Sequence, residues 1–190
     1  MDNKNNFYLQ YFTLAEKYLH TSGKIFKQIR EGGNSHVLVF DNDDCGRDYE
    51  EQTMWSDFHV LIPALFLFYH GLELMIKGLI KHNSTEHNIE LLFKEIKINY
   101  SDRADLINIF EKYIIFEKYS EIWKKYIEAN ELKDTKGLYF SLRYPTDNSF
   151  KNPYNYLPIK YQEEKILPFI QELENDSDLL CREVVKILKN

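Results

Sequence analysis

The chain has 190 residues and a formal net charge of −6, and this length fits one compact domain, residues 1–190, with a core of its own. Only seven glycines and five prolines are available for tight turns, which argues against a many-stranded sandwich or barrel. The 44% hydrophobic and 28% charged residues exclude a disordered chain, and the negative charge argues against a strongly basic nucleic-acid-binding domain while leaving room for a local basic site.

Helical periodicity dominates the first half of the chain. Apolar residues recur at steps of three, four and seven over Phe7–Ile29, which predicts an amphipathic helix. Val37–Phe40 is rich in β-forming residues, and an acidic loop is predicted for Asp41–Glu51. A second long helix is predicted from about Thr53 to Lys81, with Pro63 marking either a kink or a later start.

The second half is predicted to be helical as well, with one extended segment. A shorter helix is predicted for His87–Ile98 and a longer one for Arg103–Asn130. Gly137–Pro145 is predicted to be extended, followed by a loop rich in proline and asparagine. Ile159–Leu188 is predicted to be a helix that kinks at Pro168 or breaks at 175–177. We therefore expect an all-α bundle of about five helices with at most a minor two-stranded β element, whose strands are Val37–Phe40 and Leu138–Tyr144.

The sequence offers no sign of secretion, a membrane span or a cofactor. The two cysteines lack a Cys-x-x-Cys spacing, and the first residues lack the apolar stretch of a signal peptide. The most apolar run, Val60–Tyr69, is about half the length of a membrane span. Glycine-rich phosphate loops are absent from the sequence. We therefore expect a cytoplasmic protein that does not enter a membrane and has neither a cofactor nor a metal site.

The polar residues of the second predicted helix form a stripe. His70, Glu73 and Lys77 lie within about 60° of arc on an otherwise apolar helix. Glu73 and Lys77 form an i,i+4 pair in the favourable order. Because an unpaired buried charge is costly, the stripe must face a groove or meet polar partners. Two interpretations stay open: a functional site, or a solvated seam with one salt bridge.

The same helix and the segment after it carry a family resemblance. Glu73–Lys77 reads Glu-Leu-Met-Ile-Lys, and His87–Leu92 reads His-Asn-Ile-Glu-Leu-Leu. This pattern resembles the HEPN (higher eukaryotes and prokaryotes nucleotide-binding) domain, in which a helix with Glu-Leu-x-x-Lys precedes one that opens with His-Asp-Leu-x-x-Leu. Asn88 stands where Asp is usual in the family. The match covers about 30 residues, Leu65–Ile96. Outside the resemblance, a capping or turn role is expected for His87.

The resemblance implies an all-α up-and-down bundle that forms a homodimer. Many members of the family are metal-independent endoribonucleases of bacterial toxin–antitoxin and phage-defence systems, and others bind nucleotides or have lost catalysis. Their catalytic signature is an arginine followed four to six residues later by a histidine near the start of a late helix. The histidine can take a proton from a ribose 2′-hydroxyl, and the arginine clamps the phosphate.

The present sequence departs from that signature. The late arginine is Arg143, and no histidine follows His87. The spacing occurs once elsewhere, between Arg30 and His36, at the end of the first helix, where the family does not have it. Two interpretations of Arg30 and His36 stay open: a chance match to the spacing, or a catalytic pair.

A composite site is the other hypothesis. Arg143 would bind phosphate beside His70 as the general base, with Glu73 as its orienting partner and Lys77 or Tyr144 as auxiliary groups. The alternative for Arg143 is a salt bridge to Glu73 that holds the late loop in place.

The late aromatic segment is a candidate for RNA contact. Residues 136–161 carry a net charge of +3, from Lys136, Arg143, Lys151 and Lys160 against Asp147 alone. Bases stack on aromatic rings while cations meet phosphates, so Lys77, Tyr144 and Lys151 are candidate substrate-binding residues. The alternative is that these aromatic rings pack the late loop onto the bundle.

Two functional hypotheses result. The first is an RNA-associated HEPN-like domain of a bacterial defence or toxin–antitoxin system that acts as a metal-independent endoribonuclease. The second is a catalytically inactive helical bundle that forms a homodimer and binds a protein or a nucleotide. The missing late histidine favours the second hypothesis.

Overall fold

The computed structural model describes residues 3–35, 45–80, 86–147 and 149–189. Within these ranges the chain forms eight α-helices, three short 3₁₀ helices and no β-strand. The elements are α1 (Asn3–Glu31), α2 (Cys45–Thr53), α3 (Asp57–Ile80), α4 (Ile89–Asn99), α5 (Ala104–Ile114), η1 (Phe116–Lys118), α6 (Glu121–Ala129), α7 (Thr135–Arg143), η2 (Leu157–Ile159), η3 (Glu163–Ile166) and α8 (Leu167–Lys189). The expected all-α fold is confirmed, with more and shorter helices than the sequence predicts.

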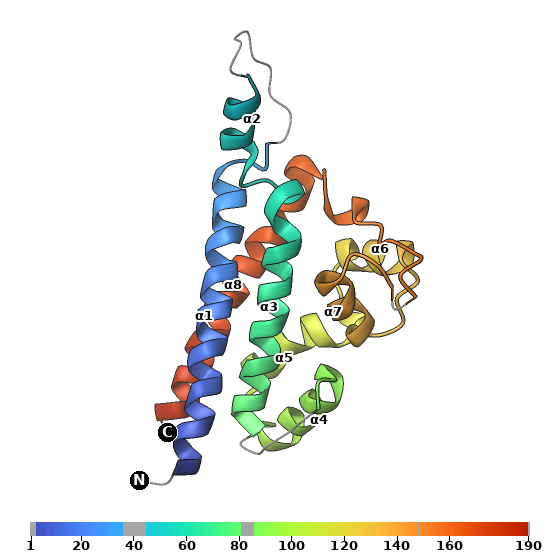
Figure 1. The fold of residues 1–190 in the computed structure, drawn as a ribbon. Coiled ribbons are helices and arrows are strands. Elements are labelled where there is room, and N and C mark those ends of the chain that lie inside the picture. The colour runs from blue at the N-terminus through green and yellow to red at the C-terminus, as the bar shows by residue number, and fades with distance from the viewer. Residues whose placement is uncertain (1–2, 36–44, 81–85, 148, 190) are drawn as a thin grey trace.

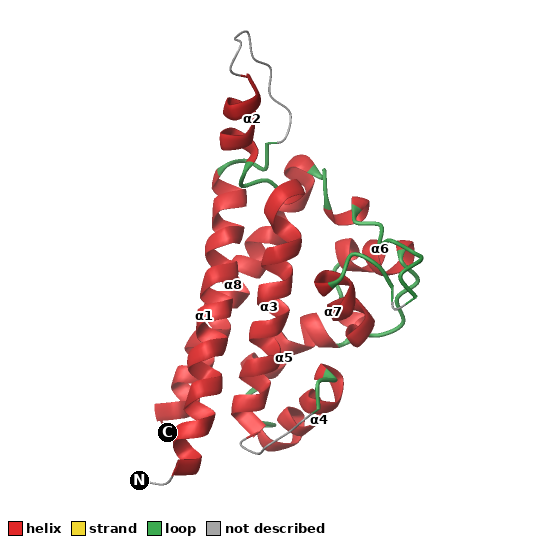
Figure 2. Ribbon diagram, viewed as in Figure 1, coloured by secondary structure: helices red, strands yellow, loops and turns green. Residues whose placement is uncertain are grey.

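Three long helices, α1, α3 and α8, form the framework of the bundle. α1 packs against both α3 and α8, and the shorter helices α4 to α7 lie on the flank of α3 that faces away from α1 (Figure 1). The two ends of the chain lie at the same end of the bundle (Figure 1). Figure 2 shows that helices and their connecting loops make up the whole described chain.

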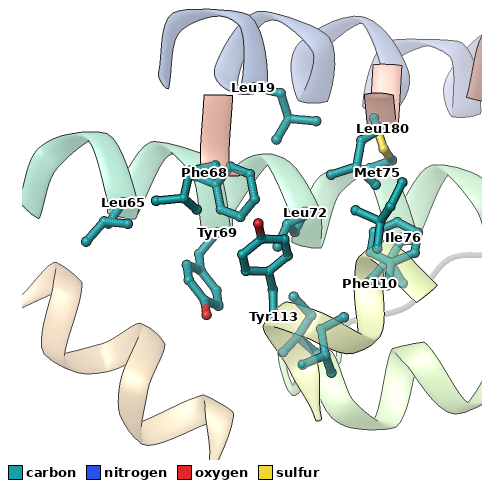
Figure 3. Packing of buried hydrophobic residues seen from close by; sticks show 14 of the residues in the cluster. Leu19, Leu65, Phe68, Tyr69, Leu72, Met75, Ile76, Phe110, Tyr113 and Leu180 are labelled. Carbon is teal, nitrogen blue, oxygen red and sulfur yellow. The ribbon is translucent and has the colours of Figure 1, made fainter. Parts of the chain in front are cut away.

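α3 is the central helix because its neighbours cover it on nearly every side. Every residue from Gly71 to Ile80 is buried. Figure 3 shows how side chains of α3 meet those of other helices; it labels Phe68, Leu72, Met75 and Ile76 of α3, Leu19 of α1, Phe110 and Tyr113 of α5, and Leu180 of α8. Burying one such apolar side chain contributes roughly 1.5–3 kcal/mol, so this cluster is the main source of stability.

α3 is also the one described helix that is long and apolar enough to cross a membrane by length and composition. Its most apolar stretch has a mean hydropathy of 1.6, and 61% of that stretch is buried inside the bundle. A buried core helix meets the same criterion, so this property of α3 gives little weight to a membrane location.

α1 and α3 approach each other closely at two glycines. A Cβ atom on Gly71 would lie 2.8 Å from Cγ of Leu19, and one on Gly78 would lie 2.8 Å from Cε1 of Phe12. Such distances are shorter than any ordinary contact between carbon atoms. Only glycine therefore allows the two helices to come this close.

The first residue of α3, Asp57, links three segments of the chain. Its buried carboxylate accepts hydrogen bonds from Nδ2 of Asn34 at 2.9 Å and from the backbone N–H groups of Tyr161 and Gln162 at 3.0 and 2.9 Å. Its own backbone N–H donates to Oδ1 of Asn34 at 2.6 Å. Because this network fixes the start of the helix at Asp57, α3 runs through Pro63 rather than starting near it.

The single helix predicted for Arg103–Asn130 is wrong, because the chain breaks between α5 and α6. Ile115 has extended backbone angles, and η1 follows it. The hydroxyl of Ser120 then accepts a hydrogen bond from the backbone N–H of Trp123 and caps α6. The change of direction buries Trp123 completely.

The extended segment predicted for Gly137–Pro145 is also wrong, because α7 occupies most of it. The carboxylate of Asp134 accepts a hydrogen bond from the N–H of Gly137 at 2.7 Å and caps this helix. Leu138 and Leu142, one turn apart, are buried against the bundle. This burial and the cap outweigh the β-forming residues of the segment.

Three further predictions differ from the structure or lie outside it. α8 begins at Leu167, so Pro168 stands in the first turn, where its missing N–H costs little, and the helix continues without a break through 175–177. Part of the predicted acidic loop is α2. The predicted strand Val37–Phe40 lies outside the described residues, and Thr146 and Pro153 form an isolated β-bridge.

The glycine contacts predict opposite effects for two alanine substitutions within helices. Gly71→Ala is expected to lower the free energy of unfolding by about 1–3 kcal/mol, because its methyl group has no room against Leu19. Gly23→Ala in α1 is the matched control, since its Cβ would lie 3.4 Å from Cβ of Ser177, an ordinary contact. It is expected to raise the free energy of unfolding by up to about 1 kcal/mol through helix propensity. Urea unfolding measures both, and equal effects would contradict the close approach.

Candidate functional site

The candidate site is built around the carboxylate of Glu73, in the middle of α3. The residue is only 4% exposed. Its Oε1 atom accepts a hydrogen bond from Nζ of Lys77 at 2.7 Å and lies 2.9 Å from Nδ1 of His87. Its Oε2 atom lies 3.8 Å from Nδ1 of His70. We call His70, Glu73, Lys77, His87 and Tyr139 the Glu73 cluster.

The partners of Glu73 keep its carboxyl group ionised. Burial alone would raise its pKa, but the nearby imidazole of His70, hydrogen bonds from Lys77 and His87, and the charge of Lys77 lower the pKa from 4.5 to about 2. An ionised carboxylate can only accept hydrogen bonds. The Nδ1 atom of His87 lies 2.9 Å from this carboxylate and 3.3 Å from Nζ of Lys77, and we assign its hydrogen to the shorter contact, with Nδ1 as donor to Glu73.

The backbone of His87 is fixed by the start of α4. Asn88 caps this helix, since its side chain accepts hydrogen bonds from the N–H groups of Glu90 and Leu91. The carboxylate of Glu86 accepts from the N–H groups of His87 and Asn88. The side chain of His87 is 76% exposed. With Nδ1–H directed to Glu73, the lone pair of the neutral ring is on Nε2, on the exposed side.

His70 lies on the other side of the same carboxylate. Its Nδ1 atom is 2.8 Å from the hydroxyl of Tyr139, and its side chain is 28% exposed. The ring packs edge-on against Tyr18 and parallel to Phe66. Burial and, secondly, the charge of Glu73 raise the pKa of Tyr139, so its hydroxyl stays neutral. Tyr139 thereby connects α7 to α3.

Arg143, the last residue of α7, lies one turn beyond Tyr139. Its guanidinium is exposed and lies 5.4 Å from the ring centre of Tyr144, and its charge opposes the rise in the pKa of Tyr139. Within the described residues Arg143 has no ion pair, so the salt bridge to Glu73 that the sequence left open is not present there. Lys151 is exposed in the loop after α7.

The structure thus brings together part of the predicted site. Glu73 contacts both His70 and Lys77, and Arg143 lies one turn beyond Tyr139 of the cluster. Sequence reasoning includes Tyr139 only as part of the aromatic segment 136–161 and gives His87 a capping or turn role. His87 belongs to the family-like motif, which is the available signal for it, whereas nothing in the sequence indicates the contact of Tyr139 with His70.

The other predicted pair has a different environment. Nε of Arg30 donates to Oε2 of Glu174 in α8 at 2.8 Å, which ties α1 to α8. His36 lies outside the described residues. Arg30 therefore has a structural partner of its own.

A cavity of about 140 Å³ lies elsewhere in the bundle. Its lining residues come from α5, η1, α6 and α8 and are Lys112, Tyr113, Lys118, Ser120, Trp123, Phe169 and Glu172. Both lysines in this lining are already paired with carboxylates. The cavity contains no member of the Glu73 cluster, and its two lysines are occupied by those ion pairs. We therefore place the candidate site at the cluster and not at the cavity. In the part of the chain that the structure describes, no group of three or more His, Cys, Asp or Glu could hold a metal ion.

Comparison with known proteins adds no relative: no family model, no curated protein and no solved structure matches this chain. What the fold and the site define is an all-α bundle with a polar cluster on its central helix.

The charge of Glu73 predicts a specific pH dependence of stability. Because its pKa is lower in the folded than in the unfolded chain, Glu73 stabilises the fold above about pH 4.5, and this contribution is lost as the pH falls toward 2. The contribution is about 3 kcal/mol. The difference in unfolding free energy between the wild type and Glu73→Gln should therefore shrink between pH 5 and pH 2.5 in urea titrations. A difference that does not change with pH would contradict the assignment.

Proposed function

We propose that this chain is an RNA-directed, metal-independent endoribonuclease whose site is the Glu73 cluster. One observation carries the proposal: a buried, ionised carboxylate holds Nδ1–H of the exposed imidazole of His87 at 2.9 Å. This arrangement fixes the ring and leaves Nε2 free to accept a proton, which is what a general base requires. A second imidazole, that of His70, lies 3.8 Å from the other oxygen of the same carboxylate.

Two imidazoles supply the acid–base chemistry of RNA cleavage. Nε2 of His87 takes the proton of a ribose 2′-hydroxyl, and the 2′-oxygen forms a bond to the adjacent phosphorus. The bond from phosphorus to the 5′-oxygen breaks, and protonated His70 gives its proton to that oxygen. The products are a 2′,3′-cyclic phosphate and a 5′-hydroxyl, and no oxidant or reductant takes part. The sequence assigned the base to His70; the exposure of His87 favours His87 in this role.

The remaining candidate residues bind and position. Arg143 is an exposed cation beside the cluster and binds the phosphate in the proposed reaction. Lys77 is buried and bonded to Glu73, so it holds the carboxylate in place rather than contacting substrate. Tyr144 and Lys151 follow Arg143 in the chain and extend the proposed contact with RNA.

The biological setting is also part of the proposal. The resemblance to the HEPN family supports a cytoplasmic homodimer in a bacterial toxin–antitoxin or phage-defence system, with a cognate protein partner. Analytical ultracentrifugation tests the homodimer directly, since a monomer at micromolar concentration would contradict it.

One observation favours the alternative, a catalytically inactive module for homodimerisation and protein or nucleotide binding. Glu73 and Lys77 are buried and bonded to each other, and of the three basic residues around Glu73 only His87 is largely exposed. A cluster of this kind also stabilises α4 and α7 against α3 without any reaction.

The proposal predicts RNA cleavage that depends on both imidazoles. In EDTA, the wild type should convert single-stranded RNA to fragments with 2′,3′-cyclic phosphate and 5′-hydroxyl ends. His87→Ala and His70→Ala should each lower the rate about 10²- to 10⁴-fold, and the pH–rate profile should be bell-shaped. Gel electrophoresis of labelled RNA, with chemical identification of the ends, measures both.

The matched control is His20→Ala, which removes an exposed imidazole of α1 outside the cluster and should leave the rate unchanged. Melting temperatures separate loss of chemistry from loss of fold. Cleavage that survives His87→Ala would refute the assignment of the base. A folded wild type that cleaves no RNA would favour the inactive module.

A further inference from the structure

Phe150 is the most exposed large hydrophobic residue in the described part of the chain. Its side chain is 85% exposed. Its backbone φ is 57°, in the left-handed region that residues other than glycine rarely adopt. The residue therefore contributes neither packing nor a relaxed backbone to the fold. Strain that folding does not need is a reason to look for a function at that residue.

The loop that carries Phe150 is held by its own hydrogen bonds. The carboxylate of Asp147 accepts from the N–H and hydroxyl of Ser149 and from Nδ2 of Asn152. The backbone N–H of Phe150 donates to the carbonyl of Asp147 at 3.0 Å, and that of Asp147 donates to the carbonyl of Asn152 at 3.0 Å. The described residues on both sides of the aromatic ring are therefore held by hydrogen bonds, which lowers the entropy cost of binding a partner.

The charge around Phe150 indicates the kind of partner. Residues 136–161 carry a net charge of +3 in a chain whose total is −6. Lys151 follows Phe150 directly and is exposed, and the exposed guanidinium of Arg143 lies over the ring of Tyr144. Exposed rings next to cations are the chemistry that binds single-stranded nucleic acid, whose bases stack while its phosphates meet the cations.

The loop is continuous with the candidate site. Tyr139 of the Glu73 cluster and Arg143 lie on successive turns of α7, and the loop begins immediately after this helix. The hydroxyl of Tyr156 donates to the carbonyl of Ser141 at 2.6 Å, which holds the far end of the loop against α7. Along the chain, Arg143 therefore lies between Tyr139 of the cluster and Phe150 of the loop.

We propose that the described loop residues 145–147 and 149–154 are a binding surface for single-stranded RNA, in which one base stacks on Phe150 while Lys151 and Arg143 contact phosphates of the same strand. The choice of RNA rests on the proposed function, but binding and cleavage can be measured separately.

The test uses an RNA that cannot be cut. A fluorescent 2′-O-methyl oligonucleotide of about 12 nucleotides lacks the nucleophile and spans the site sizes seen in single-strand binders. Fluorescence anisotropy with the full chain should show binding that weakens with salt. Phe150→Ala should weaken binding about 5- to 100-fold, and Phe150→Leu should weaken it similarly because leucine has no ring to stack.

Two controls separate binding from folding. Phe150→Gly should weaken RNA binding to the same extent while leaving the melting temperature unchanged or higher, because glycine accepts the positive φ. Ile98→Ala removes the next most exposed large hydrophobic side chain, which lies on α4 and is 76% exposed, and should not change RNA binding.

Each outcome decides one point. Binding that is equal in the wild type and Phe150→Ala overturns the proposal, and so does a wild type that binds no single-stranded oligonucleotide; the latter result would point to a protein partner for this loop. Binding that depends on Phe150, in a protein that does not cleave ordinary RNA, supports the binding surface and refutes the endoribonuclease.

Discussion

The structure depends on one constraint, the negative charge of Glu73 within the central helix. A carboxylate in a core is tolerated only when polar partners surround it. Those partners come from three places: Lys77 from the next turn of α3, His87 from the segment before α4, and Tyr139 of α7 through His70. Satisfying this charge therefore also fixes where the two short helices dock on α3.

The charge of Glu73 also links the packing of α3 against α1 with the chemistry of the candidate site. The closeness of α1 to α3 at Gly71 and Gly78 leaves no room for water on that side of α3, so the polar stripe lies on another face of the helix, at whose edge the ring of His70 still packs against Tyr18 of α1. There the bundle is built from short helices and loops, and the imidazole of His87 reaches the surface. A rigid core on one side and an exposed base on the other is the arrangement expected of a preorganised site.

Sequence periodicity predicts the long helices and the stripe of His70, Glu73 and Lys77, because these features repeat within a single helix. It does not predict Tyr139, because that contact depends on how α7 docks. Nor does it identify α7 itself: Gly137 and the β-forming residues after it suggest an extended segment, and the cap by Asp134 together with the burial of two leucines reverses this. The break at Ser120 was missed for the same reason, since a capping serine within a long apolar pattern looks like a surface residue.

The pairing of α1 with α8 bears on the order in which the chain assembles. Gly23 packs against Ser177, and Arg30 is bonded to Glu174, so the first helix is completed by the last one. During synthesis α1 can pack against α3 early. The face of α1 that contacts α8 stays exposed until α8 has left the ribosome. The surface of α1 that packs on α8 therefore has no partner before residues 167–189 are synthesised, and the bundle cannot close earlier.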